Sequence, residues 1–113
     1  MQLEARKYLF DIHKAVNLLM EFTAGKQFTD YSHDAMLRAA VEREFEIIGE
    51  ALNHLARLDS RLVASISEYR RIIAFRNILI HGYADVDDRL VWGVVETRLP
   101  KLHDEIEALL QQG

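Results

Sequence analysis

SHDAMLRAAVEREFEIIGEALNHLAR, residues 32–57, carries the clearest periodicity in this chain of 113 residues. Its apolar side chains advance by four, four, three, four and three positions: Leu37, Val41, Phe45, Ile48, Leu52 and Leu55. This spacing places them on one face of an α-helix. Ser32 is suited to act as the cap that satisfies the first free amides. The stretch therefore predicts a long amphipathic helix from Ser32 to about Arg57.

Two further helices flank this one along the sequence. Residues 3–22 repeat apolar side chains at the spacing of one helix face, and residues 67–81 are apolar almost all round between Ile72 and Ile80. The second pattern indicates burial on more than one side, either in the centre of a bundle or against a second subunit.

The connecting segments are rich in turn and cap signals. Residues 23–32 lack periodicity and are predicted to be a loop. Residues 58–65 are predicted to be a break or a short helical turn, capped by Asp59 or Ser60. Gly82 suits the left-handed residue that closes many helices.

A last helix is predicted after Asp88, with an apolar stripe that ends at Leu109. Pro100 lies inside that stripe, so the helix should kink or restart there. The whole pattern predicts an all-α protein, a four- to five-helix up-and-down bundle that forms a single domain over residues 1–113.

Composition narrows the functional classes. The chain has no cysteine, which excludes disulfides and thiolate metal sites. Residues 1–6, MQLEAR, lack a basic segment followed by an apolar stretch, and no uninterrupted apolar run approaches membrane-spanning length. We therefore expect a cytoplasmic protein with no membrane association.

Charge is unevenly distributed along the chain. A net charge of −4 argues against a protein that simply coats nucleic acid. Residues 57–83, however, contain five arginines and two acidic residues. The net charge of this stretch is +3, and that of the remainder is −7. The arginines form either a local basic patch or an ordinary solvated helix face.

Residues 76–85, RNILIHGYAD, place an arginine, a histidine and a tyrosine at an otherwise apolar helix end. The planar fork of arginine suits phosphate oxygens, and histidine exchanges protons near neutral pH. A helix turns by about 100° per residue, so Arg76 and His81 lie roughly 140° apart around its axis. They converge if the last turn is distorted, if the arginine bends round, or if two copies meet across a symmetric interface.

The motif resembles a known family. Arg76-Asn77 followed by His81-Gly82-Tyr83 matches the Arg-x-x-x-x-His-x-Tyr signature of HepT-like proteins, a branch of the HEPN superfamily. Residues 47–52, IIGEAL, resemble that family's Gly-Glu-Ala segment, and residues 72–77, IIAFRN, resemble its usual run into the motif. The length and predicted helices agree, so the resemblance covers essentially the whole chain.

The resemblance implies a fold, an activity and partners. It implies a HEPN-type bundle that forms a homodimer through the motif helix and acts as the ribonuclease toxin of a type II toxin-antitoxin pair. It also implies an MNT-type nucleotidyltransferase antitoxin that can attach AMP to the motif tyrosine. Carried over, Arg76 and His81 are the nuclease pair and Tyr83 is the AMP acceptor. No metal site and no cofactor are expected.

The chemistry of RNA cleavage fits these residue types. Cleavage without a metal requires a deprotonated 2′-hydroxyl, a protonated 5′-oxygen and stabilised charge on the phosphorane. His81 can transfer the protons and Arg76 can stabilise the charge. A second subunit would supply another copy of each, and so both an acid and a base.

Four nearby residues have supporting roles to consider. Asn77 either orients His81, contacts phosphate, or is an ordinary polar residue of the helix. Arg70 and Arg71 either position the RNA backbone or are solvated. Glu50 either holds an arginine near the site by a salt bridge or is an exposed helical glutamate.

Three other interpretations remain open. Glu50 and His54, one turn apart, could present an oxygen and a nitrogen to a metal ion, although the chain lacks the Glu-x-x-His motif of di-metal bundles. A non-catalytic helical dimer could bind a nucleotidyltransferase and present its substrate. A coiled-coil-like scaffold would explain the apolar stripes but not Arg76 and His81.

Overall fold

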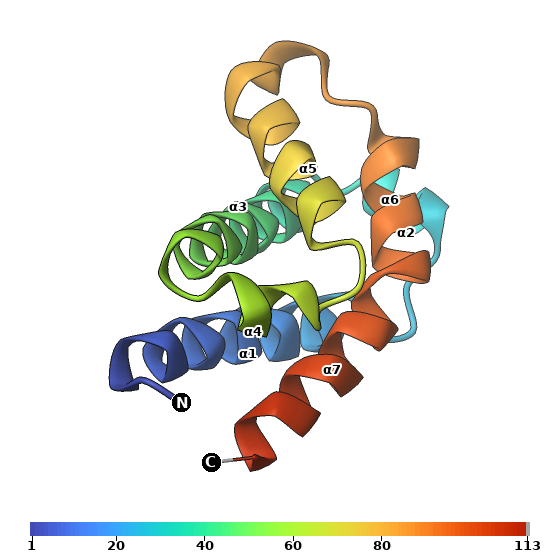
Figure 1. Ribbon diagram of the computed structural model, residues 1–113. Coiled ribbons are helices and arrows are strands. Elements are labelled where there is room, and N and C mark those ends of the chain that lie inside the picture. Colours follow the sequence, from blue (N-terminus) through green and yellow to red (C-terminus); the bar gives the residue numbers. More distant parts are fainter. Residues whose placement is uncertain (113) are drawn as a thin grey trace.

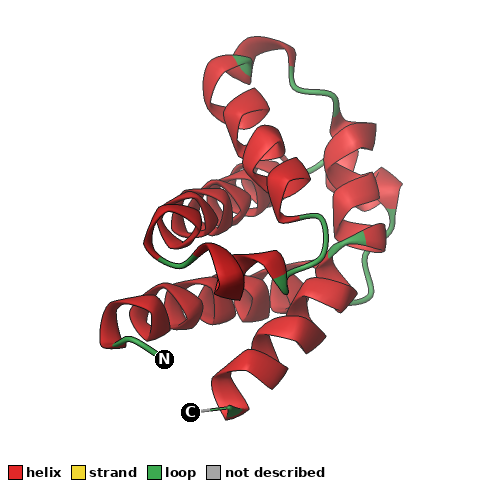
Figure 2. Cartoon of the chain, viewed as in Figure 1, coloured by secondary structure: helices red, strands yellow, loops and turns green. Residues whose placement is uncertain are grey.

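The computed structural model describes residues 1–112, without the side chain of Tyr83. Over this range the chain folds into helices and contains no strand (Figure 2). The elements are α1 (Leu3–Thr23), α2 (Phe28–Ser32), α3 (Ala35–Leu58), α4 (Ser60–Ala64), α5 (Tyr69–His81), the 3-10 turn η1 (Tyr83–Asp85), α6 (Asp88–Thr97) and α7 (Leu99–Gln111). The prediction of an all-α fold is confirmed.

The two longest helices, α1 and α3, lie side by side and run in opposite directions (Figure 1). α5 packs on α3, and α7 packs on α1. α6 joins these parts, because it contacts both the short helix α2 and α7. Both ends of the described chain lie at one end of the molecule, while the end of α5 that carries His81 lies at the other (Figure 1).

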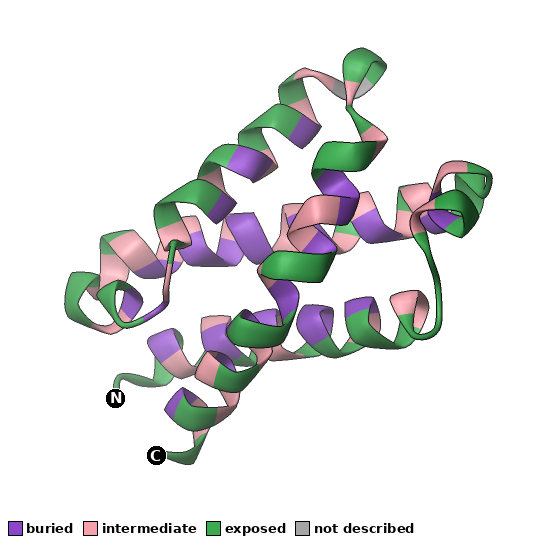
Figure 3. Ribbon diagram, turned by 90° about the vertical axis from the view of Figure 1, so that its right-hand side faces the viewer, coloured by how far each residue is buried: buried purple, intermediate pink, exposed green. Residues whose placement is uncertain are grey.

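The predicted apolar stripes form the core. Every apolar residue of the α3 stripe is buried, as are the matching residues of α1. Phe45 of α3 and Phe75 of α5 meet edge to face, with ring centroids 5.3 Å apart. Figure 3 shows buried residues along the inward sides of the helices and exposed residues outside. Burial of these side chains is the main force that holds the bundle together.

The start of α3 differs from the prediction. Ser32 is not its cap, because Ser32 is the last residue of α2 and its hydroxyl donates to the carbonyl of Thr29 at 3.3 Å. The cap is Asp34, whose carboxylate accepts from the amide of Leu37 at 3.0 Å. The five-residue helix α2 occupies much of the predicted loop and moves the start of α3 along the chain.

The later boundaries follow the prediction with one exception. Asp59 caps α4 by accepting from the amide of Leu62 at 3.1 Å. Pro100 is the second residue of α7, so it restarts a helix, as expected. Gly82, however, has φ −109° and is not left-handed. The chain continues directly into η1, and therefore needs no reversal at Gly82.

Candidate active site

Arg76 lies where α5 crosses α3, directly against Gly49. A Cβ added to Gly49 would lie 2.7 Å from Cγ of Arg76 and closer still to its Cβ. Real Cβ atoms do not approach side chains so closely, so the crossing requires glycine at this position. The missing side chain of Gly49 thereby lets the arginine lie along α3, next to Glu50.

The guanidinium of Arg76 is held by two neighbours. Its Nη2 donates to Oε2 of Glu50, and its Nη1 donates to Oδ1 of Asn77 at 2.9 Å. The side chain of Arg76 is 22% exposed, and its Nε is buried without a hydrogen-bond partner among the described atoms. A charge-assisted hydrogen bond of this kind fixes orientation as well as adding stability. Of the two roles considered for Glu50, the salt bridge to an arginine is present, and Asn77 contacts Arg76 rather than His81.

Glu50 uses its second oxygen on His54. Its Oε1 lies 3.0 Å from Nε2 of His54, whose Nδ1 in turn lies 3.1 Å from Nη2 of Arg57. Tyr8, from α1, stacks on the imidazole with ring centroids 5.2 Å apart and planes 6° from parallel. The sequence alone did not predict a role in the site for Tyr8 or Arg57, and it suggested His54 only as a metal ligand. The spacing of residues 50, 54 and 57 on one helix face is the signal that could have found the chain of contacts on α3.

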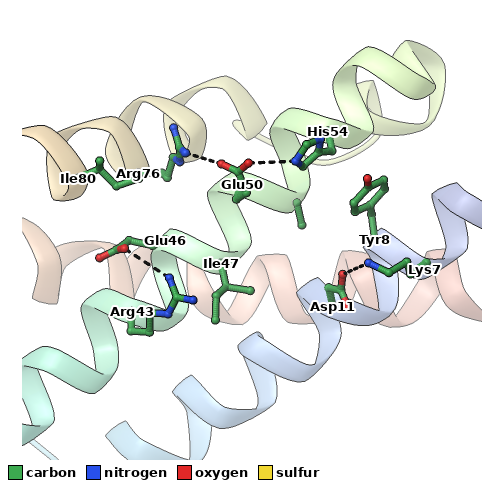
Figure 4. A pocket seen from close by; sticks show the side chains of 11 residues that line it. Lys7, Tyr8, Asp11, Arg43, Glu46, Ile47, Glu50, His54, Arg76 and Ile80 are labelled. Carbon is green, nitrogen blue, oxygen red and sulfur yellow. Dashed lines mark hydrogen bonds and ion pairs between the residues drawn. The ribbon is translucent and has the colours of Figure 1, made fainter.

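A pocket of about 470 Å³ opens beside this chain of contacts, between α1, α3 and α5 (Figure 4). Its lining residues are Lys7, Tyr8, Asp11, Arg43, Glu46, Ile47, Glu50, Ala51, His54, Arg76 and Ile80. Two more ion pairs lie along the helices that line it. Lys7 pairs with Asp11 on α1 at 3.2 Å, and Arg43 pairs with Glu46 on α3 at 3.7 Å. The pocket therefore balances cations against carboxylates, and Arg76 borders it from α5.

His81 occupies a different position. It is the last residue of α5, is exposed, and makes no side-chain hydrogen bond or ion pair with the described residues. The helix is regular up to this point, because the amide of Gly82 still donates to the carbonyl of Ile78 at 2.8 Å. Nor does Arg76 bend round, since it is held on α3. Within one chain, therefore, neither a distorted last turn nor a bent arginine brings the two side chains together, and their convergence across a symmetric interface remains a prediction.

The other predicted residues lie apart from this centre. Arg71 pairs with Glu68 at 2.9 Å, and Arg70 packs on the ring of Tyr69. Both are exposed near the first turn of α5, about 16 Å along the helix axis from His81. Within one chain the structure does not bring them together with His81. The proposed modification of Tyr83 falls on a side chain outside the described residues.

A second concavity, which we call the α5–α6 groove, runs along the side of α5 that faces α6. It has a volume of about 440 Å³ and is lined by Arg71, Ile72, Ala74, Phe75, Ile78, Arg89, Leu90, Gly93, Val94, Thr97 and Arg98. Ile78 is 46% exposed and Leu90 is 44% exposed. The second buried side predicted for this helix is therefore not covered within the single chain.

Neither a metal-binding cluster nor a membrane-spanning helix is found among the described residues. The described residues contain no group of three His, Asp or Glu side chains that could hold a metal ion. The Glu50–His54 pair considered for this purpose is already engaged, with Arg76 and Arg57 as its further partners. Between residues 1 and 112, no helix has the length and apolar character that a membrane crossing requires.

Comparison with known proteins places the chain in a family. The family model described as "Ribonuclease HepT-like" matches residues 12–109. A "Probable ribonuclease HepT" of Thermococcus cleftensis is 38% identical over 92% of this chain and 94% of its own length. A protein of Methanocaldococcus jannaschii, named as a putative RNase, is 34% identical over the same shares of the two chains. No solved structure matches the chain. This protein therefore belongs to the HepT-like ribonuclease family of the HEPN superfamily.

Proposed function

We propose that this protein is a metal-independent endoribonuclease toxin that cleaves RNA at a composite site between the two subunits of a homodimer. The observation that carries the proposal is the placement of the motif in a chain of this ribonuclease family. Arg76 is anchored on α3 by Glu50, and an exposed His81 ends the same helix. One group is fixed in place and the other is accessible to substrate.

The reaction needs the motif in two copies. One His81 takes the proton from the 2′-hydroxyl, whose oxygen attacks the phosphorus, while the second His81 protonates the departing 5′-oxygen. The products are a 2′,3′-cyclic phosphate and a free 5′-hydroxyl. Arg76 stabilises the negative charge that builds up on the phosphorane oxygens. A regular helix that keeps Arg76 and His81 on different sides supports sharing between subunits.

The α5–α6 groove is the surface that supports dimerisation through the motif helix. It carries the exposed apolar residues Ile78 and Leu90 on either side, and such a surface is stabilised by being covered. Its arginines, Arg71 among them, would lie near the path of a bound RNA backbone and add sequence-independent attraction.

Regulation is proposed to act at Tyr83. An MNT-type nucleotidyltransferase antitoxin would attach AMP to the tyrosine hydroxyl, two residues beyond His81. Each AMP adds bulk and negative charge, which repel and exclude the RNA phosphates. The antitoxin and the toxin would thus form one regulated pair.

The decisive experiment is RNA cleavage in the presence of chelator, followed by subunit mixing. Arg76→Ala and His81→Ala should each abolish cleavage without changing the size of the assembly. When wild type and His81→Ala are mixed and re-equilibrated, a site that needs both copies works only in wild-type homodimers. At equal amounts, the activity should then be about one quarter of that shown by the same total amount of wild type. Independent protomers would instead keep about one half. Retention of one half would refute the composite site.

One observation favours a second candidate, a non-catalytic dimer that binds a nucleotidyltransferase and presents its substrate. The positive charge of Arg76 is already paired with Glu50 in the single chain. One experimental result would distinguish the two functions. If the protein accepts AMP at Tyr83 but does not cleave RNA, the non-catalytic dimer is favoured.

A further inference from the structure

His54 has no part in the reaction proposed for this protein, yet three side chains hold it in place. It projects from α3 into the pocket beside Arg76 (Figure 4). Glu50 and Arg57 contact its two ring nitrogens, and Tyr8 stacks on its face. These contacts come from two helices, so they fix both the position and the plane of the imidazole.

The hydrogen bonds assign the proton on the ring. A guanidinium carries only donors, so Nδ1 of His54 must accept from Arg57. The proton of the neutral ring is then on Nε2, where it is donated to Oε1 of Glu50. Both bonds coexist only with this neutral tautomer, because a protonated imidazole has no acceptor.

Occupation of one oxygen of Glu50 has a consequence for Arg76. Carboxylates and guanidinium groups readily form two parallel hydrogen bonds. Because Oε1 is taken by His54, Glu50 offers Arg76 Oε2. The arginine is thereby held in one orientation and is less completely neutralised than it would be in a two-bond pair.

We infer that His54 is a positioning residue for Arg76. It keeps Glu50 from turning both oxygens toward the guanidinium, and so keeps Arg76 available to a phosphate. Arg57 and Tyr8 support this role by fixing the tautomer and the ring plane. The inference rests on the proposed function, in which Arg76 contacts the reacting phosphate.

Two substitutions separate the hydrogen bonds from the stacking. In His54→Gln the amide nitrogen can donate to Glu50 while the amide oxygen accepts from Arg57, so both bonds can form. In His54→Phe the stacking on Tyr8 is kept and both bonds are lost. We expect kcat for RNA cleavage to fall between about 10- and 100-fold in His54→Phe with little change in KM, and to stay within about twofold in His54→Gln.

The recovery of kcat in His54→Gln is a readout that a purely structural role would not give. His103→Gln, on α7, is the matched histidine control and should keep the kcat of wild type. If His54→Phe does not fold, Arg57→Met tests the same point, since it removes the partner that fixes the tautomer.

The proposed function and the positioning role of His54 are refuted by different results. If Arg76→Ala cleaves RNA as well as wild type does, the proposed function is wrong whatever His54 does. If Arg76→Ala is inactive while folded His54→Phe keeps the kcat of wild type, the positioning role is overturned.

Discussion

Glu50 of α3 and Arg76 of α5 form an ion pair across the crossing of the two helices. Each side chain has a second partner, His54 for Glu50 and Asn77 for Arg76. The pair therefore links the helix packing to the sequence motif.

This pair should contribute measurably to stability. Glu50→Ala and Arg76→Ala should each lower the free energy of unfolding, and the double variant should lose less than the sum. We expect a coupling of about 1 kcal/mol, because the pair is charge-assisted and Arg76 is only 22% exposed. Urea denaturation of the four proteins gives the value. A coupling near zero would show that the pair adds nothing beyond solvation of its members.

Gly49→Ala should destabilise the protein by about 1–3 kcal/mol, because the new methyl group meets the Arg76 side chain and forces α3 and α5 apart. RNA cleavage should fall with it, since the guanidinium moves. Gly93→Ala is the matched control, because a Cβ there has no atom within 4 Å and should stabilise α6 by up to about 1 kcal/mol. Thermal unfolding compares the two. Equal effects would rule out the close approach as the cause.

Ile78→Asp should convert the proposed dimer to a monomer without unfolding it. Ile78 is 46% exposed in the single chain, so a charge there costs little until the α5–α6 groove is covered by a second copy. Leu3→Asp, at a position that is 86% exposed on α1, is the control. Light scattering after size-exclusion chromatography reports the mass. A dimer that tolerates Ile78→Asp and still cleaves RNA places the interface elsewhere.

Tyr83→Phe should keep RNA cleavage but lose AMP transfer, because the hydroxyl is the proposed acceptor while the ring is retained. After incubation with ATP and the nucleotidyltransferase, the intact mass of wild type should increase by AMP and that of the variant should not. Tyr69→Phe should behave as wild type. Modification of Tyr83→Phe to the wild-type extent would assign the acceptor to another residue.

Glu42→Gln should raise the melting temperature at neutral pH. Burial, together with the nearby carboxylates of Asp88 and Glu46, raises the pKa of Glu42 in the folded protein. The ionised form is thus disfavoured by folding, and this penalty applies above the raised pKa. It disappears below the ordinary value, where both states are protonated. The gain should therefore vanish near about pH 3, and Glu21→Gln, at an exposed position, should show no gain at either pH. A gain that persists in acid would point to packing instead.

Most of the fold was predictable because amphipathic periodicity depends on sequence alone. The long helices α1 and α3 follow directly from it, and the restart near Pro100 follows from the proline itself. The short helix α2 was missed, because its five residues are too few for a periodic signal. It depends instead on a capping box between Gln27 and Asp30.

The candidate site was predictable only in part. For Glu50 the sequence left two roles open, a salt bridge to an arginine or an exposed helical glutamate, and the contact with Arg76 corresponds to the first. The stacking of Tyr8 on His54 depends on how α1 and α3 approach one another, which spacing along one helix does not reveal. The roles of Arg76 and His81 in cleavage, and the homodimer in which they would converge, remain predictions.

The close approach at Gly49 also restricts how this protein can diverge. Most buried positions tolerate gradual exchange between residues of similar size. At Gly49 even one extra carbon displaces Arg76. A substitution at that position therefore disturbs both the helix packing and the motif. A related sequence without this glycine must also change the geometry of the helix crossing.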